Sequence, residues 1–115
     1  MLFRSHAKSE QFLKEMGVII KSSVTEIDRV GHMRDDEFGI ILPERNKRQA
    51  THVAEGIRKR IEDGAVKSVV PDKKITVSIG VSENPIDGST AEELMDKAKR
   101  LVHNAKSLGK NRVSV

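Results

Sequence analysis

Residues 33–43 read Met-Arg-Asp-Asp-Glu-Phe-Gly-Ile-Ile-Leu-Pro, an acidic turn that runs directly into an apolar segment. Residues 37–42 have high β-propensity, and Pro43 ends them because proline cannot donate to a sheet ladder. Residues 27–33 read as a preceding strand, with Val30 and Met33 expected in the core. The two strands predict a β-hairpin whose tip projects carboxylates. Carboxylates at such a tip suit a divalent cation and a phosphorylated ligand.

Three segments outside the hairpin carry the apolar spacing of amphipathic helices. Residues 9–23 place apolar side chains one helical turn apart along one face. Capping-box patterns open the other two helices at Asn46 and at Thr90. Glycines at positions 64 and 109 are expected to end them, because glycine readily takes the left-handed conformation that follows a helix.

Two further strands complete the predicted elements. Residues 74–82 alternate apolar and polar side chains, which predicts a half-buried strand, and residues 112–115 suit a short terminal strand. Residues 65–74, which lie between the second helix and the first of these strands, are expected to form a loop or a weak edge strand. The resulting order predicts a single α+β domain over residues 1–115. Its helices pack on one mainly antiparallel sheet, in a ferredoxin-like or palm-like sandwich.

Composition narrows the class of protein. The chain has 115 residues, of which 37% are hydrophobic and 33% charged, so we expect a water-soluble domain with one modest core. No apolar run reaches the roughly 20 residues of a membrane span, and a cytoplasmic location is the default. The absence of cysteine excludes disulfides and thiol catalysis. The net charge is +4, but tyrosine and tryptophan are absent and the basic residues are dispersed, so we expect no nucleic-acid partner.

Several separated stretches agree in sequence and order with one family. They are Phe-Gly-Ile-Ile-Leu-Pro at 38–43, Val-Ala-Glu-Gly-Ile-Arg at 53–58, Ile-Thr-Val-Ser-Ile-Gly-Val-Ser at 75–82, Ala-Glu-Glu-Leu at 91–94 and Ala-Lys-Ser-Leu-Gly-Lys-Asn-Arg-Val at 105–113. With the acidic turn, this set resembles the GGDEF domain of diguanylate cyclases from about Ser5 to the end of the chain.

The resemblance implies a chemistry for the acidic turn. The family condenses two GTP molecules into cyclic di-GMP, using Mg²⁺ and two domains that face each other, which implies a homodimer. A 3′-hydroxyl attacks an α-phosphate, and carboxylates hold the metal that neutralises the phosphate charge. By resemblance, Asp36 takes the catalytic and metal-binding position, and Glu37 takes the catalytic acidic position beside it.

The resemblance also assigns nucleotide-binding positions. Lys106 and Lys110 match residues that reach the triphosphate, and Glu10 matches the acidic residue that reads guanine. Arg34 and Asp35 stand where the family has two glycines, whose positive φ lets the backbone approach the phosphates. Asp35 adds a negative charge there, and one such charge at about 4 Å from a phosphate oxygen costs roughly 4 kcal/mol at an effective dielectric constant of 20.

A further departure concerns the start of the domain. The family begins with a strand and a helix that carry an Asp-x-Asp-x-Phe-Lys…Asn-Asp pattern, which supplies another metal carboxylate and a guanine-reading Asn. The pattern is not found before Ser5, so we expect an N-terminally truncated domain. That strand is central in the family's sheet, so its loss predicts a gap. We expect the gap to be closed by residues 1–4, by strand exchange with another copy, or by a longer natural protein.

The family's inhibitory product site uses an Arg-x-x-Asp pattern just ahead of the turn. Here Thr25 replaces the arginine and Asp28 remains as the remnant of the site. Bidentate recognition of phosphate or guanine by a guanidinium is therefore lost.

Three functions follow as hypotheses. The first is a degenerate GGDEF domain without cyclase activity, which serves an unknown sensor domain as a regulatory, nucleotide-binding or dimerising module and binds GTP or cyclic di-GMP. The second is an active diguanylate cyclase that needs Mg²⁺ and is completed by the missing segment. The third is a protein interaction domain without a ligand.

Overall fold

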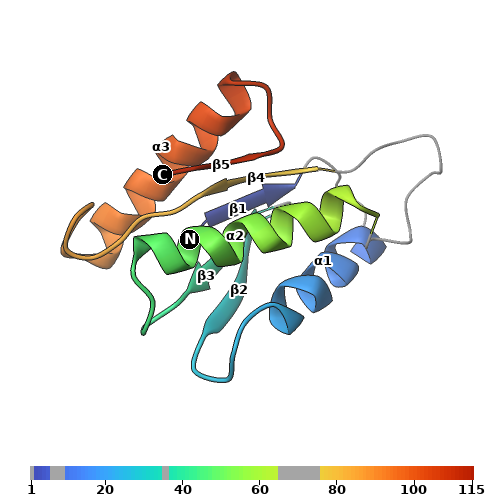
Figure 1. Cartoon of the computed structure of the whole chain (residues 1–115), viewed down its shortest axis with the longest axis horizontal. Coiled ribbons are helices and arrows are strands. Elements are labelled where there is room, and N and C mark those ends of the chain that lie inside the picture. Colours follow the sequence, from blue (N-terminus) through green and yellow to red (C-terminus); the bar gives the residue numbers. More distant parts are fainter. Residues whose placement is uncertain (1, 6–9, 35–36, 65–75) are drawn as a thin grey trace.

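The computed structural model describes residues 2–5, 10–34, 37–64 and 76–115. Its elements follow in the order β1 (Leu2–Ser5), α1 (Glu10–Ser22), β2 (Arg29–Arg34), β3 (Glu37–Ile41), α2 (Lys47–Glu62), β4 (Val77–Gly80), α3 (Ala91–Ser107) and β5 (Arg112–Ser114). The predicted order of helices and strands is confirmed, with one strand added in front (Figure 1). The segment expected at residues 65–74 lies outside the described residues.

The sheet has the strand order β2-β3-β1-β4-β5. β1 is antiparallel to both of its neighbours, so that Phe3 lies opposite Phe38 of β3 on one side and opposite Ile79 of β4 on the other. β2 and β3 form the predicted antiparallel hairpin, and β5 runs parallel to β4 at the far edge. The prediction of a mainly antiparallel sheet is confirmed.

The expected gap at the centre of the sheet is not present. β1 supplies the central strand from the chain's own residues, and its ladders to β3 and β4 leave no break between them. The first of the three expected ways of closing the sheet, residues 1–4 acting as a stub, is therefore the one observed. An exchanged strand from a second copy is not needed to complete this sheet.

Helices cover both faces of the sheet. α1 and α2 lie on one face and α3 lies on the other (Figure 1). The main core sits between the sheet and the pair α1 and α2, and it is almost entirely aliphatic. Its fully buried side chains include Met16 and Ile20 of α1, Ile57 and Ile61 of α2, and Ile79 of β4.

The strand predicted at 74–82 is more deeply buried than its pattern indicated. All four residues of β4 are buried, and Ser78 has no exposed surface. The half-buried prediction is wrong because α3 packs on the face that the polar and small residues line. An alanine Cβ at Gly80 would lie 2.3 Å from the carbonyl oxygen of Ala98 in α3.

The predicted core position of Met33 is also wrong. Val30 packs against the core, but Met33 is 49% exposed. The two residues are three apart, and side chains alternate between the faces of a strand, so both cannot point to the same side.

The helix boundaries follow the predicted caps. The Asn46 side chain accepts from the backbone N–H of Gln49, and the Gln49 side chain accepts from the backbone N–H of Asn46, a complete capping box. The Thr90 hydroxyl accepts from the backbone N–H of Glu93 in the same way.

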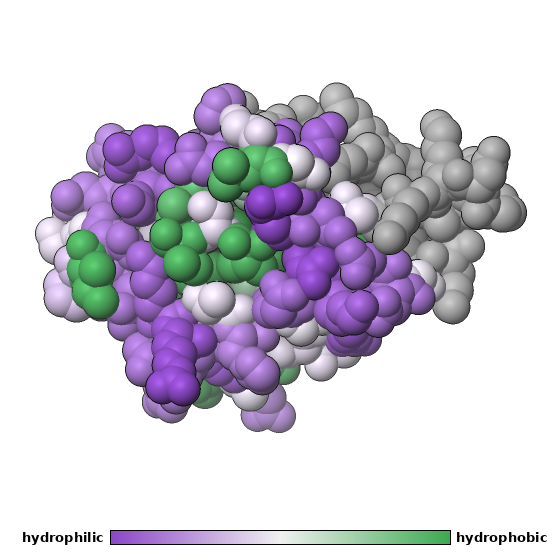
Figure 2. All heavy atoms as spheres, turned by 45° about the horizontal axis from the view of Figure 1, so that its top comes forward, coloured by the Kyte–Doolittle hydropathy of each residue, from purple (hydrophilic) through white to green (hydrophobic). Residues whose placement is uncertain are grey.

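The described surface is not uniformly polar. Figure 2 shows apolar side chains gathered near the middle of one face, with hydrophilic side chains around them. Large apolar side chains that are exposed among the described residues are Val18, Ile27, Met33, Ile41, Ile86, Leu108 and Val115.

Candidate functional site

The hairpin tip and the end of α3 lie at the same end of the sheet. Glu37, at the start of β3, is opposite Arg4 of β1, and Arg4 is in turn opposite Ser78 of β4. Ser78 lies opposite Arg112, the first residue of β5. Glu37 and Arg112 are therefore in one row across the sheet. Three interstrand steps, about 14 Å, separate their backbones.

The predicted triphosphate lysines lie at this end. Lys106 is half-buried in the last turn of α3, and Lys110 is exposed in the short turn that leads into β5. Glu10 begins α1 shortly after β1 ends, and β1 ends beside the start of β4. Arg34 is the last residue of β2 and pairs with Glu37 after a register shift. Asp35 and Asp36 lie outside the described residues.

A Schellman motif shapes the turn that carries Lys110. The backbone N–H of Lys110 donates to the carbonyl of Ala105 at 2.9 Å, and the N–H of Gly109 donates to the carbonyl of Lys106 at 3.3 Å. Gly109, Lys110 and Asn111 have φ values of 117°, 64° and 50°. Three successive residues in this region turn the chain sharply from α3 into β5 and expose the Lys110 side chain.

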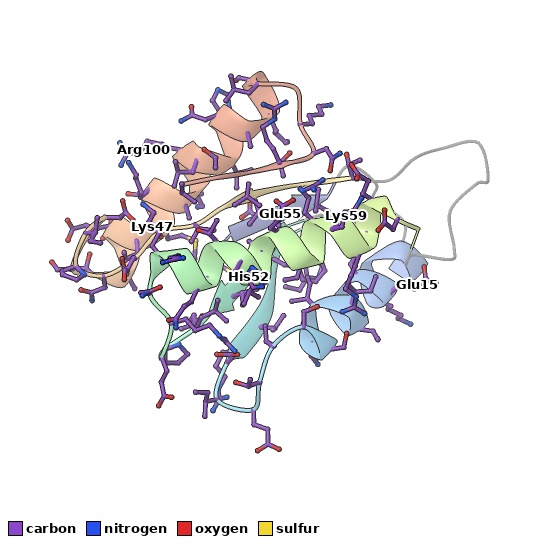
Figure 3. The ribbon with its side chains drawn as sticks, viewed as in Figure 1. Glu15, Lys47, His52, Glu55, Lys59 and Arg100 are labelled. Carbon is purple, nitrogen blue, oxygen red and sulfur yellow. The ribbon has the colours of Figure 1, made fainter. Side chains whose placement is uncertain are left out.

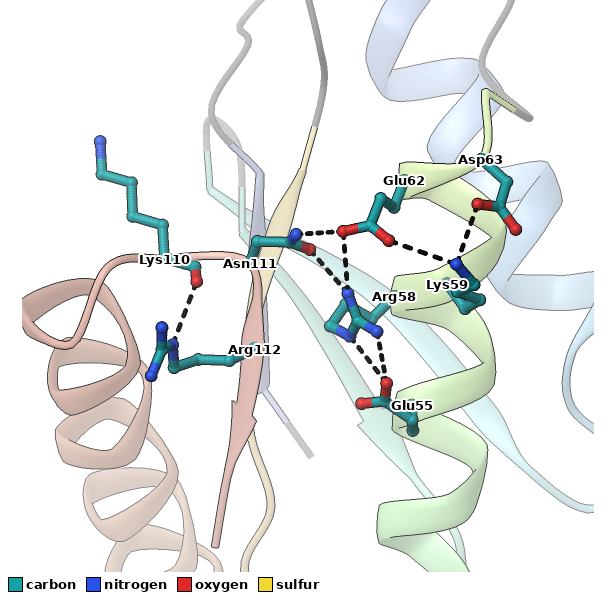
Figure 4. Close-up of polar contacts among 8 residues, drawn as sticks. All are labelled: Glu55, Arg58, Lys59, Glu62, Asp63, Lys110, Asn111 and Arg112. Carbon is teal, nitrogen blue, oxygen red and sulfur yellow. Dashed lines mark hydrogen bonds and ion pairs between the residues drawn. The ribbon is translucent and has the colours of Figure 1, made fainter.

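Asn111 ties this turn to α2 (Figure 4). Its side-chain oxygen accepts from Arg58 at 2.9 Å, and its amide donates to Glu62. Arg58 also donates to Glu55 and Glu62, and hydrogen bonding to Glu55 is the largest influence that raises the pKa of Arg58. Neither Arg58 nor Asn111 was a predicted site residue. Of this cluster, only the spacing of Glu55, Arg58 and Glu62 along one helix could have been seen in the sequence.

We expect Asn111→Ala to destabilise the domain by about 2 kcal/mol. The substitution removes the hydrogen bonds to Arg58 and Glu62, and it places a Cβ-bearing residue without a stabilising side chain at positive φ. Urea unfolding followed by circular dichroism measures the loss. Asn111→Gly tolerates the same φ and should cost less, so equal losses for the two variants would contradict the backbone part of this explanation.

The described residues do not by themselves assemble a metal site. No group of three or more His, Asp or Glu side chains lies close enough together among them to hold a metal ion. Glu37 is half-buried at the start of β3, and its acidic neighbours in sequence are Asp35 and Asp36, outside the description. The charged residues labelled along α2 in Figure 3, Glu55 and Lys59 among them, lie on a different element from the hairpin tip.

Asp28, which the sequence predicts to be the remnant of a product site, is held inside the protein. Its side chain is 1% exposed and pairs with Arg45 at 2.7 Å. The same carboxylate oxygen, Oδ2, accepts from the backbone N–H of Thr25 at 2.8 Å and from its hydroxyl at 3.0 Å. The sequence showed Thr25 and Asp28 three residues apart, but not Arg45, which is 17 residues further on. The guanidinium that reaches Asp28 is therefore that of Arg45, in the segment between β3 and α2, and not that of a residue at position 25.

Two buried carboxylates should make stability depend on acid pH. Burial raises the pKa of Asp28, but the hydrogen bonds from Arg45 and Thr25 outweigh it, and the pKa lies below its ordinary value. The pKa of Asp87 is lowered in the same way, with burial opposed by Lys47 and the backbone N–H of Glu83. A depressed folded pKa adds stability above the ordinary value of about 4, and this stability is lost as pH falls further.

We therefore expect the free energy of unfolding to fall steeply below about pH 4. Urea titrations at a series of pH values measure it. Asp28→Asn should flatten this fall, because its amide does not titrate. An unchanged slope in that variant would show that Asp28 does not contribute to the acid transition.

A mainly antiparallel sheet with helices on both faces, and with the start of β3 at the same end of the sheet as the basic end of α3, defines the class of palm-like α+β domains. The family model described as "Diguanylate cyclase, GGDEF domain" matches residues 4–112. The chain belongs to the GGDEF family.

Curated relatives agree with this assignment. Diguanylate cyclase A of Treponema denticola is 34% identical over 113 residues, which are 96% of this chain and 30% of the relative. The response regulator PleD of Caulobacter vibrioides is 32% identical over 111 residues, 94% of this chain and 24% of that protein. The chain thus spans less than a third of the length of these relatives.

Solved structures show the same fold. The GGDEF domain of YfiN (TpbB) from Pseudomonas aeruginosa superposes with a TM-score of 0.85 at 19% identity, over 98% of this chain and 78% of that one. The active GGEEF domain of a diguanylate cyclase from Vibrio cholerae gives a TM-score of 0.79 at 17% identity, with the same coverage. Among the described residues, no helix has the length and apolar character needed to cross a membrane.

Proposed function

We propose that this chain is a degenerate GGDEF module of cyclic di-GMP signalling that does not make cyclic di-GMP. It acts instead as a regulatory unit, through nucleotide binding or dimerisation, for a sensor domain. Its membership of the GGDEF family supports the signalling context. The loss of synthesis is argued from the residues themselves.

The observation that carries the proposal is the segment in and after β1. β1 occupies the central strand position, where the family's first strand is expected to lie, and residues 6–9 separate it from α1. Residues 2–9 read Leu-Phe-Arg-Ser-His-Ala-Lys-Ser and contain no carboxylate. Four residues make about one helical turn, too few for the family's helix with its guanine-reading Asn.

The hairpin tip supports the same conclusion. Arg34 and Asp35 stand in place of two glycines, and the ladder between β2 and β3 is irregular between His32 and Arg34. Neither residue is a glycine, so the close approach of the backbone to phosphate that the family's glycines allow is not expected here. Asp35 also repels the triphosphate, and a repulsion of roughly 4 kcal/mol corresponds to about three decades in affinity.

Nucleotide binding remains chemically reasonable at this end of the sheet. Lys106 and Lys110 flank a turn that Asn111 fixes, so a phosphate group can approach two amines without reordering the backbone. Calorimetry with GTP and with cyclic di-GMP tests this binding. The double variant Lys106→Ala, Lys110→Ala should weaken GTP binding at least about tenfold. Lys99→Ala, an exposed lysine on the same helix, should leave it unchanged.

If neither GTP nor cyclic di-GMP gave binding heat, the nucleotide-binding form of the proposal would be wrong. Light scattering then tests the dimerising form. A chain that is monomeric at high concentration would rule out that form as well. Equal losses of GTP affinity in the single variant Lys99→Ala and in the double variant Lys106→Ala, Lys110→Ala would show nonspecific attraction to a basic helix.

An active cyclase is the second candidate. It is favoured by the position of Glu37, Lys106 and Lys110 at the same end of the sheet. In that case Asp36 and Glu37 would hold Mg²⁺, which would neutralise phosphate charge during attack of the 3′-hydroxyl. Two copies would have to face each other, each with one GTP.

A further inference from the structure

The turn between α3 and β5 has an unfavourable backbone conformation. Lys110 and Asn111 have φ values of 64° and 50°, in the left-handed region that residues with a Cβ rarely occupy. Asparagine tolerates this region better than lysine, because its short polar side chain can form local hydrogen bonds. Strained residues persist only where their surroundings hold them, and they are frequent at ligand-binding sites. The contacts that hold this turn therefore bear on what Lys110 can bind.

Two charged side chains of α2 hold the turn (Figure 4). The guanidinium of Arg58 donates to the side-chain oxygen of Asn111 at 2.9 Å, and the amide of Asn111 donates to the carboxylate of Glu62. Arg58 also donates to Glu62 at 3.3 Å, so the three side chains contact one another. The Arg58 and Glu62 side chains are 14% and 20% exposed. Hydrogen bonds to charged groups are stronger than those between neutral groups.

The strain in the turn and the bonds to α2 are of comparable size. A residue with a Cβ loses roughly as much free energy in the left-handed region as one hydrogen bond to a charged group returns. Two strained residues are set against two such bonds. The backbone bonds to α3 precede Asn111 in the chain, whereas Arg58 and Glu62 act on Asn111 itself. Without Arg58, we expect the turn to adopt other conformations more often.

The conformation of the turn decides where the Lys110 amine stands. Figure 4 shows the Lys110 side chain extending away from Asn111 and from the helix that carries Arg58. The Lys110 carbonyl accepts from the Arg112 side chain at 3.2 Å. Lys106 lies close by in the chain, in the last turn of α3. A ligand that needs both amines binds with full affinity only in the competent conformation, because apparent affinity falls with the fraction of competent molecules.

We propose that Arg58 and Glu62 are positioning residues for the binding of a polyphosphate group at this turn. They hold Asn111 in the left-handed conformation, and the turn in this state presents Lys110 to the polyphosphate beside Lys106. The inference rests on the proposed nucleotide binding. It adds that the affinity for the nucleotide is set by side chains of α2, a helix other than the one that carries Lys106.

Calorimetry of the full chain with GTP and with inorganic tripolyphosphate tests the proposal. Arg58→Met should weaken the binding of both at least about tenfold, because methionine suits a helix but has no N–H group to donate. Arg60→Met is the matched control. It removes the same charge from the same helix, but the Arg60 guanidinium bonds to Ser22 and Ser23. We expect its affinities to stay within about twofold of the unmodified chain.

Glu62→Met separates positioning from charge. The substitution removes a carboxylate near the turn, so attraction between charges alone would make GTP bind more tightly. Positioning predicts the opposite, a loss of at least about threefold, because Asn111 loses an acceptor. The NMR Cα chemical shifts of Lys110 and Asn111 report the left-handed backbone. They should change in Arg58→Met and Glu62→Met and stay the same in Arg60→Met.

The outcomes distinguish this inference from the proposed function. If the unmodified chain bound neither GTP nor tripolyphosphate, this inference and the nucleotide-binding form of the proposed function would both be wrong. If it bound them and Arg58→Met lost no more affinity than Arg60→Met, only the positioning role would be wrong. Tighter binding by Glu62→Met would contradict that role and would assign the effect of Arg58 to charge.

Circular dichroism confirms that each variant is folded at the temperature of the titration. Should Arg58→Met fail to fold, the titration of Glu62→Met decides on its own.

Discussion

Gly80→Ala is expected to cost more than about 3 kcal/mol and to leave much of the chain unfolded. A Cβ at this position would lie 2.3 Å from the carbonyl oxygen of Ala98 and 2.9 Å from the Cβ of Leu101. The nearest atom belongs to backbone, so relief requires α3 to move away from the sheet. That movement would open the buried surface of β4. Urea unfolding followed by circular dichroism measures the loss.

Gly56→Ala is the control for this substitution. Gly56 lies in the middle of α2, and an added Cβ there meets nothing within 4 Å. Alanine is the better helix former, so the variant should be more stable by about 0.5–1 kcal/mol. If Gly80→Ala were as stable as the unmodified chain, the close contact between α3 and β4 would be wrong.

Phe3→Pro should disrupt the domain by about 3 kcal/mol or more. Phe3 pairs with Phe38 on one side of β1 and with Ile79 on the other, so β1 is bonded along both edges. Proline removes a ladder donor and is found almost only at sheet edges. The loss is measured by urea unfolding, and hydrogen exchange of β3 and β4 should rise with it.

Phe3→Leu keeps the backbone donor and should cost less than about 1.5 kcal/mol. Comparing the stabilities of Phe3→Pro and Phe3→Leu separates the contribution of the backbone hydrogen bonds of β1 from that of the Phe3 side chain. A Phe3→Pro variant with native stability and unchanged protection of β3 would show that β1 is not the central strand. The argument that β1 occupies the place of the family's metal-bearing first strand would then fail as well.

Much of the fold could be predicted because the local signals agree with one another. The capping patterns at Asn46 and Thr90, the glycine at 109 and the hairpin before Pro43 all mark boundaries that the structure keeps. β1 was expected only as a stub, because four residues carry no periodicity. The burial of Ser78 could not be predicted, since it depends on α3 packing on the second face of β4.

The structure places Glu37, Lys106 and Lys110 at one end of the sheet, and their roles stay predictions. The bonds that hold this end could not be predicted, because they are long-range. Asn111 contacts Glu62, 49 residues away, and such a pair leaves no trace in a single sequence.

Incubation of the chain with GTP and Mg²⁺, followed by mass detection of cyclic di-GMP, tests the proposed loss of synthesis most directly. We predict no cyclic di-GMP above the level of a protein-free control. A cyclic di-GMP signal that Asp36→Ala abolishes would contradict the proposal and would identify the chain as an active diguanylate cyclase.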